Sequence, residues 1–157
     1  MTAAYPSGDF FPLLGAKAAL GRVLTPDDDR RGERAVVLSY NLWRRRFGGD
    51  PNIVGRTLPL GDGGATVVGV MPRSFRLPEW AEIWMPLGAI PAGNRAVIEK
   101  RGNHADSRVI ARLRPGVSAA QAKAAMGVIA RRLAELYPSE QKDWPKVEMM
   151  RPTDISP

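Results

Sequence analysis

Residues 35–47 join an apolar run directly to an amphipathic helix, and this junction is the strongest constraint on the fold. AVVL at 35–38 is an uninterrupted apolar segment of strand length, which is typical of a buried β-strand. Ser39 is a suitable helix N-cap, and the residues after it repeat with a helical period up to Phe47. The apolar face of that helix consists of Leu42, Trp43 and Phe47. A buried strand followed at once by a helix predicts a mixed structure of sheet and helix.

Three consecutive arginines, Arg44, Arg45 and Arg46, lie in the last turn of this predicted helix. With 100° between successive residues, Arg44 and Arg45 point away from the apolar face, whereas Arg46 lies nearer to it and can lay its stem along it. The pair Gly48-Gly49 ends the helix, and arginines in the last turn suit the negative end of its dipole. We therefore expect these arginines to form a solvent-facing or partner-facing surface.

The net charge of +7 makes binding of an acidic partner, either nucleic acid or anionic lipid, the main alternative function. Acidic residues interrupt the basic ones throughout, and the sequence has no run of five or six like charges. It also lacks RNA-recognition aromatic motifs, zinc fingers and a clear helix-turn-helix pattern. A nucleic-acid or anionic-surface binding domain is thus supported by the net charge alone.

Other local patterns in the first 90 residues also alternate between helix and strand. They are a helical turn at 10–14 capped by Ser7 or Asp9 and ended by Gly15, a helix start at TPDDD (25–29), a hairpin of 56–60 and 65–72 around the glycines of 61–64, and a short strand within 82–87. Three adjacent aspartates rarely converge on one metal ion, and the glycines at 61–64 lack the lysine and the following helix of a phosphate-binding loop. Both segments are better explained as structural elements.

The last third of the chain predicts a strand–helix–strand unit. SRVIARL at 107–113 alternates polar and apolar residues like a half-buried strand. Ser118 and Gln121 have the spacing of a capping box, and apolar residues then recur at helical spacing until Pro138. VEMM at 147–150 is the expected returning strand, and the polar segment 91–103 is the expected loop or linker.

The residues that could carry chemistry do not form a convincing site. The sequence has no cysteine and one histidine, His104, so thiolate ligands and paired-histidine metal motifs are excluded. His104, Asp106 and Ser107 are too close in sequence for a typical catalytic triad, and no pattern places Glu79 and Glu82 in a cleft. We therefore expect no catalytic, cofactor-binding or metal-binding residues. A small hydrolase using these side chains is the weaker alternative.

Several long phrases resemble one family. They are YPSGDFFPLLGAKAALGR (5–22), LTPDD (24–28), VVLSYNLWRRRFGGDPNIVGRTLPL (36–60), ATVVGVMP (65–72) and RLRPGVSAAQAKAAMGVIARRLAELYP (112–138). In this order they resemble the periplasmic core domain of MacB-type ABC transporter permeases, in the branch common in acidobacterial genomes. The resemblance covers nearly the whole chain.

This resemblance implies an α+β fold with a porter-like β-α-β part and a smaller inserted α/β lobe. The lobe would comprise residues 14–87, and residues 1–13 with 104–152 would belong to the porter-like part. The first transmembrane helix and first porter segment of the family have no counterpart in these residues, so we expect the porter-like part to be incomplete. Gly48, Gly49, Asp50 and Gly55 would be backbone-geometry positions.

The function implied is that of a non-catalytic extracytoplasmic module, the periplasmic part of an inner-membrane protein. It would couple ATP hydrolysis in the cytoplasm to export or mechanical work in the periplasm. The chain would need no cofactor, since a separate ATPase subunit or domain would bind ATP. Expected partners are the transmembrane helices of the permease, the ABC ATPase, and a periplasmic adaptor or second permease copy. Arg44, Arg45 and Arg46 would face such a partner.

Overall fold

The computed structural model describes residues 1–61, 63–91, 93–95, 100, 108–141 and 148–149. The chain divides into two compact units, residues 1–92 and 93–157. We call the first the N-terminal lobe and the second the C-terminal unit, and each is described by itself.

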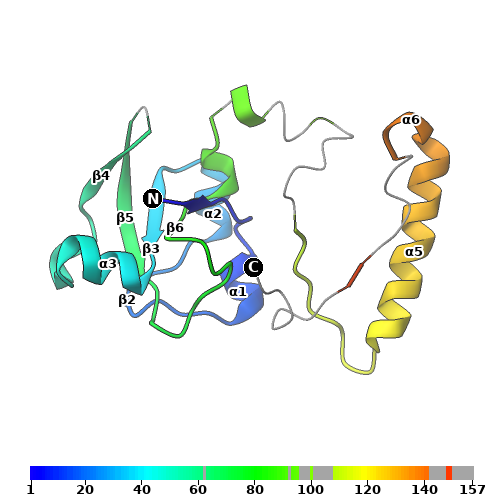
Figure 1. Ribbon diagram of the computed structural model, residues 1–157, viewed down its shortest axis with the longest axis horizontal. Helices are drawn as coiled ribbons and strands as arrows, with labels where there is room; N and C mark the ends of the chain where they lie inside the picture. Colours follow the sequence, from blue (N-terminus) through cyan, green and yellow to red (C-terminus); the bar gives the residue numbers. More distant parts are fainter. Residues whose placement is uncertain (62, 92, 96–99, 101–107, 142–147, 150–157) are drawn as a thin grey trace. The chain divides into compact units, whose positions relative to one another are not determined.

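The N-terminal lobe is built on one mixed β-sheet with the strand order β1-β6-β3-β5-β2, and β4 pairs with β5 as a branch (Figure 1). The strands are β1 (Ala3–Ala4), β2 (Leu20–Gly21), β3 (Ala35–Leu38), β4 (Thr57–Leu60), β5 (Gly63–Val70) and β6 (Ile83–Trp84). The helices are α1 (Phe10–Leu14), α2 (Pro26–Arg31) and α3 (Tyr40–Phe47), with short 3-10 turns η1 (Pro51–Ile53) and η2 (Leu87–Ala89). The lobe is therefore mixed α+β, as predicted.

Strand β3 has a neighbour on each side and a core on each face. It runs parallel to β5, with Ala35 opposite Thr66, and antiparallel to β6, with Leu38 opposite Ile83. Side chains alternate across the sheet, so Val36 and Leu38 belong to one hydrophobic core and Ala35 and Val37 to the other. This explains the uninterrupted apolar run: all four residues are buried.

The two cores use different helices. Leu42 of α3 is buried in the first core, and Trp43 and Phe47 pack against it. The second core contains Phe11 of α1, whose ring meets Trp84 edge-on at 6.1 Å between centroids. Helices α3 and α1 thus cover opposite faces of the sheet (Figure 1).

The predicted local elements of the lobe are confirmed. Ser39 caps α3 and Gly48 ends it with a φ of 64°. Thr25 caps α2 with Pro26 in the first turn. Strands β4 and β5 form the predicted antiparallel hairpin, but Gly63 and Gly64 pair with Leu60 and Pro59 and so belong to β5, not to the turn. The glycines at 48, 49 and 55 all have positive φ, so they are the backbone-geometry positions that were expected.

Residues 1–13 contribute to the sheet and to the core of the N-terminal lobe. Strand β1 pairs in parallel with β6, and Phe11 is fully buried in the second core, so both belong with the N-terminal lobe. The reason is backbone pairing, because β6 offers β1 the hydrogen-bonding partner that an isolated strand lacks. The domain division stays a prediction: the lobe at 14–87, the porter-like part at 1–13 and 104–152, and the linker at 91–103.

In the C-terminal unit the predicted helix is confirmed and the predicted strands are not. Helix α5 (Ala119–Leu136) starts at the expected Ser118–Gln121 capping box, and a short helix α6 (Pro138–Gln141) follows. Residues 108–113 and 148–149 are not in strands, while Ser107, Val147 and Met150 lie outside the described residues. Alternating side chains make a segment suitable for a sheet, but a strand also needs a neighbouring strand, and the described part of this unit supplies none.

Candidate partner-facing surface and the polar contacts behind it

The arginines of α3 lie on the surface, as predicted. Arg44, Arg45 and Arg46 are all exposed, whereas Leu42 on the opposite face is 1% exposed. The helix is held in place by Trp43, whose indole Nε1 donates to the backbone carbonyl of Asp50 at 2.9 Å. The direction of the arginine side chains follows from burial of the apolar face of α3.

Arg45 differs from its two neighbours because it forms an ion pair with Glu82. The carboxylate of Glu82 also accepts a hydrogen bond from the backbone N–H of Thr2 at 3.1 Å. The hydrogen bond from Arg45 lowers the pKa of Glu82 below its usual value, and this outweighs the opposing effect of burial. Arg45 therefore helps to fasten α3 to the residue that precedes β6 and, through Glu82, to the start of the chain.

Arg44 and Arg46 form no ion pair with any residue that the structure describes. The side chain of Arg44 lies against the backbone of Gly49, in the space that a Cβ would take. Two of the three predicted partner-facing residues are thus available to an acidic group, and the third is already paired.

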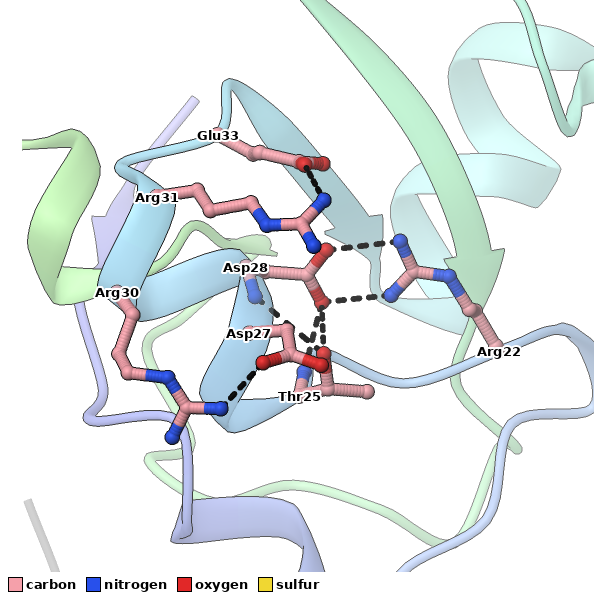
Figure 2. Close-up of polar contacts among 7 residues, drawn as sticks. All are labelled: Arg22, Thr25, Asp27, Asp28, Arg30, Arg31 and Glu33. Atoms are coloured by element: carbon pink, nitrogen blue, oxygen red, sulfur yellow. Dashed lines mark hydrogen bonds and ion pairs between the residues drawn. The ribbon is translucent and has the colours of Figure 1, made fainter.

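The acidic turn of α2 is organised around Asp28, the buried charged residue of the lobe's core (Figure 2). Its carboxylate accepts hydrogen bonds from both terminal nitrogens of Arg22, at 2.6 and 2.8 Å. It also accepts from the backbone N–H of Thr25 at 2.7 Å and from the Thr25 hydroxyl at 2.8 Å. These contacts close a capping box at the start of α2.

The charge state of Asp28 follows from these contacts. Burial raises the pKa of its carboxyl, but the hydrogen bonds from Arg22 and Thr25 and the charge of Arg22 lower it by more. The net result is a pKa below the ordinary value, so Asp28 is ionised at neutral pH. The predicted helix start is correct, and the spacing of Thr25 and Asp28 is the sequence signal that could have revealed the capping box. The partner, Arg22, has no comparable signal.

Asp29 joins three segments that are distant in sequence. One carboxylate oxygen accepts from the backbone N–H of Gly8 at 3.0 Å, and the other accepts from that of Gly88 at 2.6 Å. Each of the aspartates in this turn therefore has a structural partner, since Asp27 pairs with Arg30. Among the described residues, no group of three or more acidic or histidine side chains could hold a metal ion.

Two of the residues considered for catalysis, Glu79 and Glu82, can be placed in the described structure. Glu79 lies 3.8 Å from Arg76 and Glu82 pairs with Arg45, so each glutamate has an arginine partner. His104, Asp106 and Ser107 lie outside the described residues.

Comparison with known proteins identifies the family. The model of the MacB-like periplasmic core domain matches residues 1–128. This chain belongs to that family. A curated relative, the macrolide export ATP-binding/permease protein MacB of Chromobacterium violaceum, is 32% identical over 123 residues, which are 77% of this chain and 18% of that protein. The protein of the same name from Burkholderia thailandensis is 30% identical over 80 residues, which are 49% of this chain and 12% of that protein.

Solved structures show the same fold. The periplasmic region of MacB from Actinobacillus actinomycetemcomitans matches with a TM-score of 0.58 and 18% identity, over 88% of this chain and 58% of that one. A domain of a putative permease protein from Porphyromonas gingivalis matches with a TM-score of 0.51 and 20% identity over the same shares. This MacB-like chain thus spans less than a fifth of the curated relatives and somewhat more than half of each of these two solved chains.

The family places the chain on the periplasmic side of an inner-membrane ABC transporter permease. No helix in the described ranges is both long and apolar enough to cross a bilayer.

Proposed function

We propose that this MacB-like domain is a mechanical module without an active site of its own, which couples ATP hydrolysis in the cytoplasm to export or other work in the periplasm. The observation that carries this proposal is the family match over residues 1–128. ATP would be bound by a separate ATPase subunit or domain, as the relatives' name, ATP-binding/permease protein, suggests. The chain would bind no cofactor.

The way in which the lobe is fastened together supports a mechanical role. Polar contacts join segments far apart in sequence, namely Thr2 to Glu82, Gly8 to Asp29, and Asp29 to Gly88. Combined with two packed cores, they make the lobe suitable for moving as one body. In this proposal Arg44 and Arg46 face a partner that moves with it, either a periplasmic adaptor or a second permease copy.

The charge of the N-terminal lobe gives the nucleic-acid alternative no support. Residues 1–92 contain 11 Lys and Arg against 9 Asp and Glu, which leaves only +2 of the total of +7 on the lobe. Arginines at 22, 30, 31, 45, 56 and 76 are paired with acids. Nucleic-acid binding would have to weaken steeply as salt rises, and we expect no such binding.

The coupling can be tested with the full-length parent transporter in lipid vesicles. A donor dye is attached at Asn41→Cys on the exposed side of α3, after replacement of any other cysteine of the parent, and acceptor dyes are placed in the lipid. We expect ATP turnover to change the energy transfer, and a variant with an inactive ATPase to abolish the change. Unchanged transfer during measured ATP hydrolysis would refute the coupling.

The partner surface is tested in the same preparation. The double variant Arg44→Ala/Arg46→Ala should uncouple the transporter, with ATP hydrolysis retained and periplasmic work reduced. Arg30→Ala/Arg31→Ala is the matched control, because these are also two exposed arginines in the last turn of a helix. Equal activity of the two double variants would contradict a partner role for α3.

A further inference from the structure

The segments that lead into and out of the N-terminal lobe run side by side in the same direction. Strand β1 is parallel to β6, with Ala3 opposite Ile83 and Ala4 opposite Trp84. The pairing continues beyond these short strands in a regular ladder. The backbone N–H groups of Ile83, Met85 and Leu87 donate to the carbonyls of Thr2, Ala4 and Pro6, at 3.2, 3.0 and 3.0 Å respectively.

Both ends of this ladder are reinforced by side chains. At one end, Thr2 donates through its hydroxyl to the Trp80 carbonyl at 2.6 Å and through its N–H to the Glu82 carboxylate. At the other end, the Asp29 carboxylate bridges the N–H groups of Gly8 and Gly88. We call residues 2–8, residues 80–88 and Asp29 together the strand clasp.

The glycines are required where the clasp closes. A Cβ on Gly88 would overlap the backbone carbonyl of Asp29, and one on Gly8 would overlap Pro26. Only a residue without a side chain lets these backbones come close enough for one carboxylate to hold both. A carboxylate bonded to backbone N–H groups makes stronger hydrogen bonds than a neutral acceptor does.

The direction of pairing decides how the clasp responds to tension. In a parallel pair, the beginning of one strand and the end of the other lie at opposite ends of the ladder. Pulling residue 1 away from residue 91 therefore slides the two strands along each other and loads all ladder bonds together. Pulling at the beginning of both strands would instead break the bonds one after another.

We propose that the strand clasp is a shear-loaded device that lets the lobe carry tension between residues 1 and 91 without unfolding. The segment between the two strands, residues 9–79, then stays outside the path of the force except for Asp29. The inference deepens the proposed function and rests on it for its biological use, but the mechanical property belongs to the lobe itself.

The test is single-molecule pulling on the full 157-residue chain, which has no cysteine of its own. Handles are attached to cysteine pairs, Met1→Cys with Pro91→Cys for shear and Met1→Cys with Glu79→Cys for unzipping; all three sites are exposed. We expect a severalfold higher unfolding force in the shear geometry. Rupture should release about 300 Å of extended chain, which identifies the lobe as the unit that unfolds. Equal forces in both geometries would overturn the proposal.

Variants then assign the resistance to the clasp. Asp29→Ala should lower the shear force and leave the unzipping force nearly unchanged, whereas Asp27→Ala, in the same helical turn, should alter neither. Asp29→Asn keeps one acceptor oxygen and serves if the alanine variant does not fold, with an intermediate shear force expected. A shear force insensitive to both Asp29 variants would refute the role of this residue.

The result also separates the two proposals. A high shear force together with an ATP-independent position of the lobe in the parent transporter would leave the clasp standing and refute only the coupling. A low shear force together with ATP-dependent movement of the lobe would refute the clasp and leave the coupling standing.

Discussion

Replacing Asp28 by alanine should lower the free energy of unfolding by about 3 kcal/mol at neutral pH. The substitution removes the half of the capping box in which the Asp28 carboxylate accepts from the backbone N–H and the hydroxyl of Thr25, which is worth about 1 kcal/mol. It also removes hydrogen bonds from Arg22 to an ionised acceptor that is 3% exposed, worth about 2 kcal/mol. The loss should not be larger, because the Arg22 side chain is 47% exposed and regains water.

The effect of Asp28 should depend on pH in a defined direction. Its folded-state pKa lies below the unfolded value, so its ionised form stabilises the fold above roughly pH 4. That contribution is lost as the pH falls through the folded-state pKa. The difference in stability between wild type and Asp28→Ala should therefore be complete at pH 7 and become smaller below about pH 4.

Urea unfolding followed by tryptophan fluorescence at pH 7 and at pH 3 measures both effects. Asp27→Ala is the matched control, because Asp27 lies in the same turn, carries the same charge and is 64% exposed. It should change stability by no more than about 0.5 kcal/mol. A loss below about 1 kcal/mol for Asp28→Ala at pH 7, or a loss that is the same at both pH values, would refute the assignment of Asp28 as a charged structural partner.

Three further substitutions test other parts of the lobe. Leu42→Ala should cost about 2–5 kcal/mol in urea unfolding, since the side chain is 1% exposed in the first core, and a cost below about 1 kcal/mol would contradict that packing. Gly69→Ala should destabilise the lobe more than Gly15→Ala does. A Cβ at Gly69 would overlap the Arg22 carbonyl, whereas a Cβ at Gly15 meets no atom and adds only the strain of a φ of 65°. A lower melting temperature for Gly15→Ala than for Gly69→Ala would contradict this geometry. Glu82→Gln should lower the free energy of unfolding by at most about 1 kcal/mol at pH 7 and by less below about pH 4, because the lowered pKa of Glu82 means that its ionised carboxylate stabilises the fold. A loss of stability that becomes larger on acidification would contradict this direction of the pKa shift.

The elements that were predicted correctly are those with local signals. Ser39 with Gly48, and Thr25 with Pro26, mark helix ends through residues a few positions apart. The apolar run at 35–38 predicts a strand that is buried on both faces. The exposure of Arg44 to Arg46 could also be predicted, since it follows from the helical period alone.

The elements that were missed depend on pairing between distant residues. Strand β1 consists of two alanines with little β-propensity, and only its partner β6 makes it a strand. The ion pair of Arg45 with Glu82 spans 37 positions, and the contact of Asp29 with Gly88 spans 59. Conversely, the alternation of polar and apolar residues at 108–113 fits a strand, but the structure places these residues outside any strand, so the prediction of a strand there was wrong. A local pattern cannot supply the second strand that pairing requires.

The long separation between β1 and β6 has a consequence for the order in which the chain folds. The hairpin of β4 and β5 and its pairing with β3 use residues 35–70, so these contacts are local and can form early. Residue 2 must wait until residue 82 has been made, which takes about 4–16 s at ordinary rates of synthesis. During that time the first segment has no strand to pair with. The sheet is therefore completed when β6, the last strand of the lobe to be made, pairs with β1, the first. The N-terminal segment, although made first, is the last to take its place in the sheet.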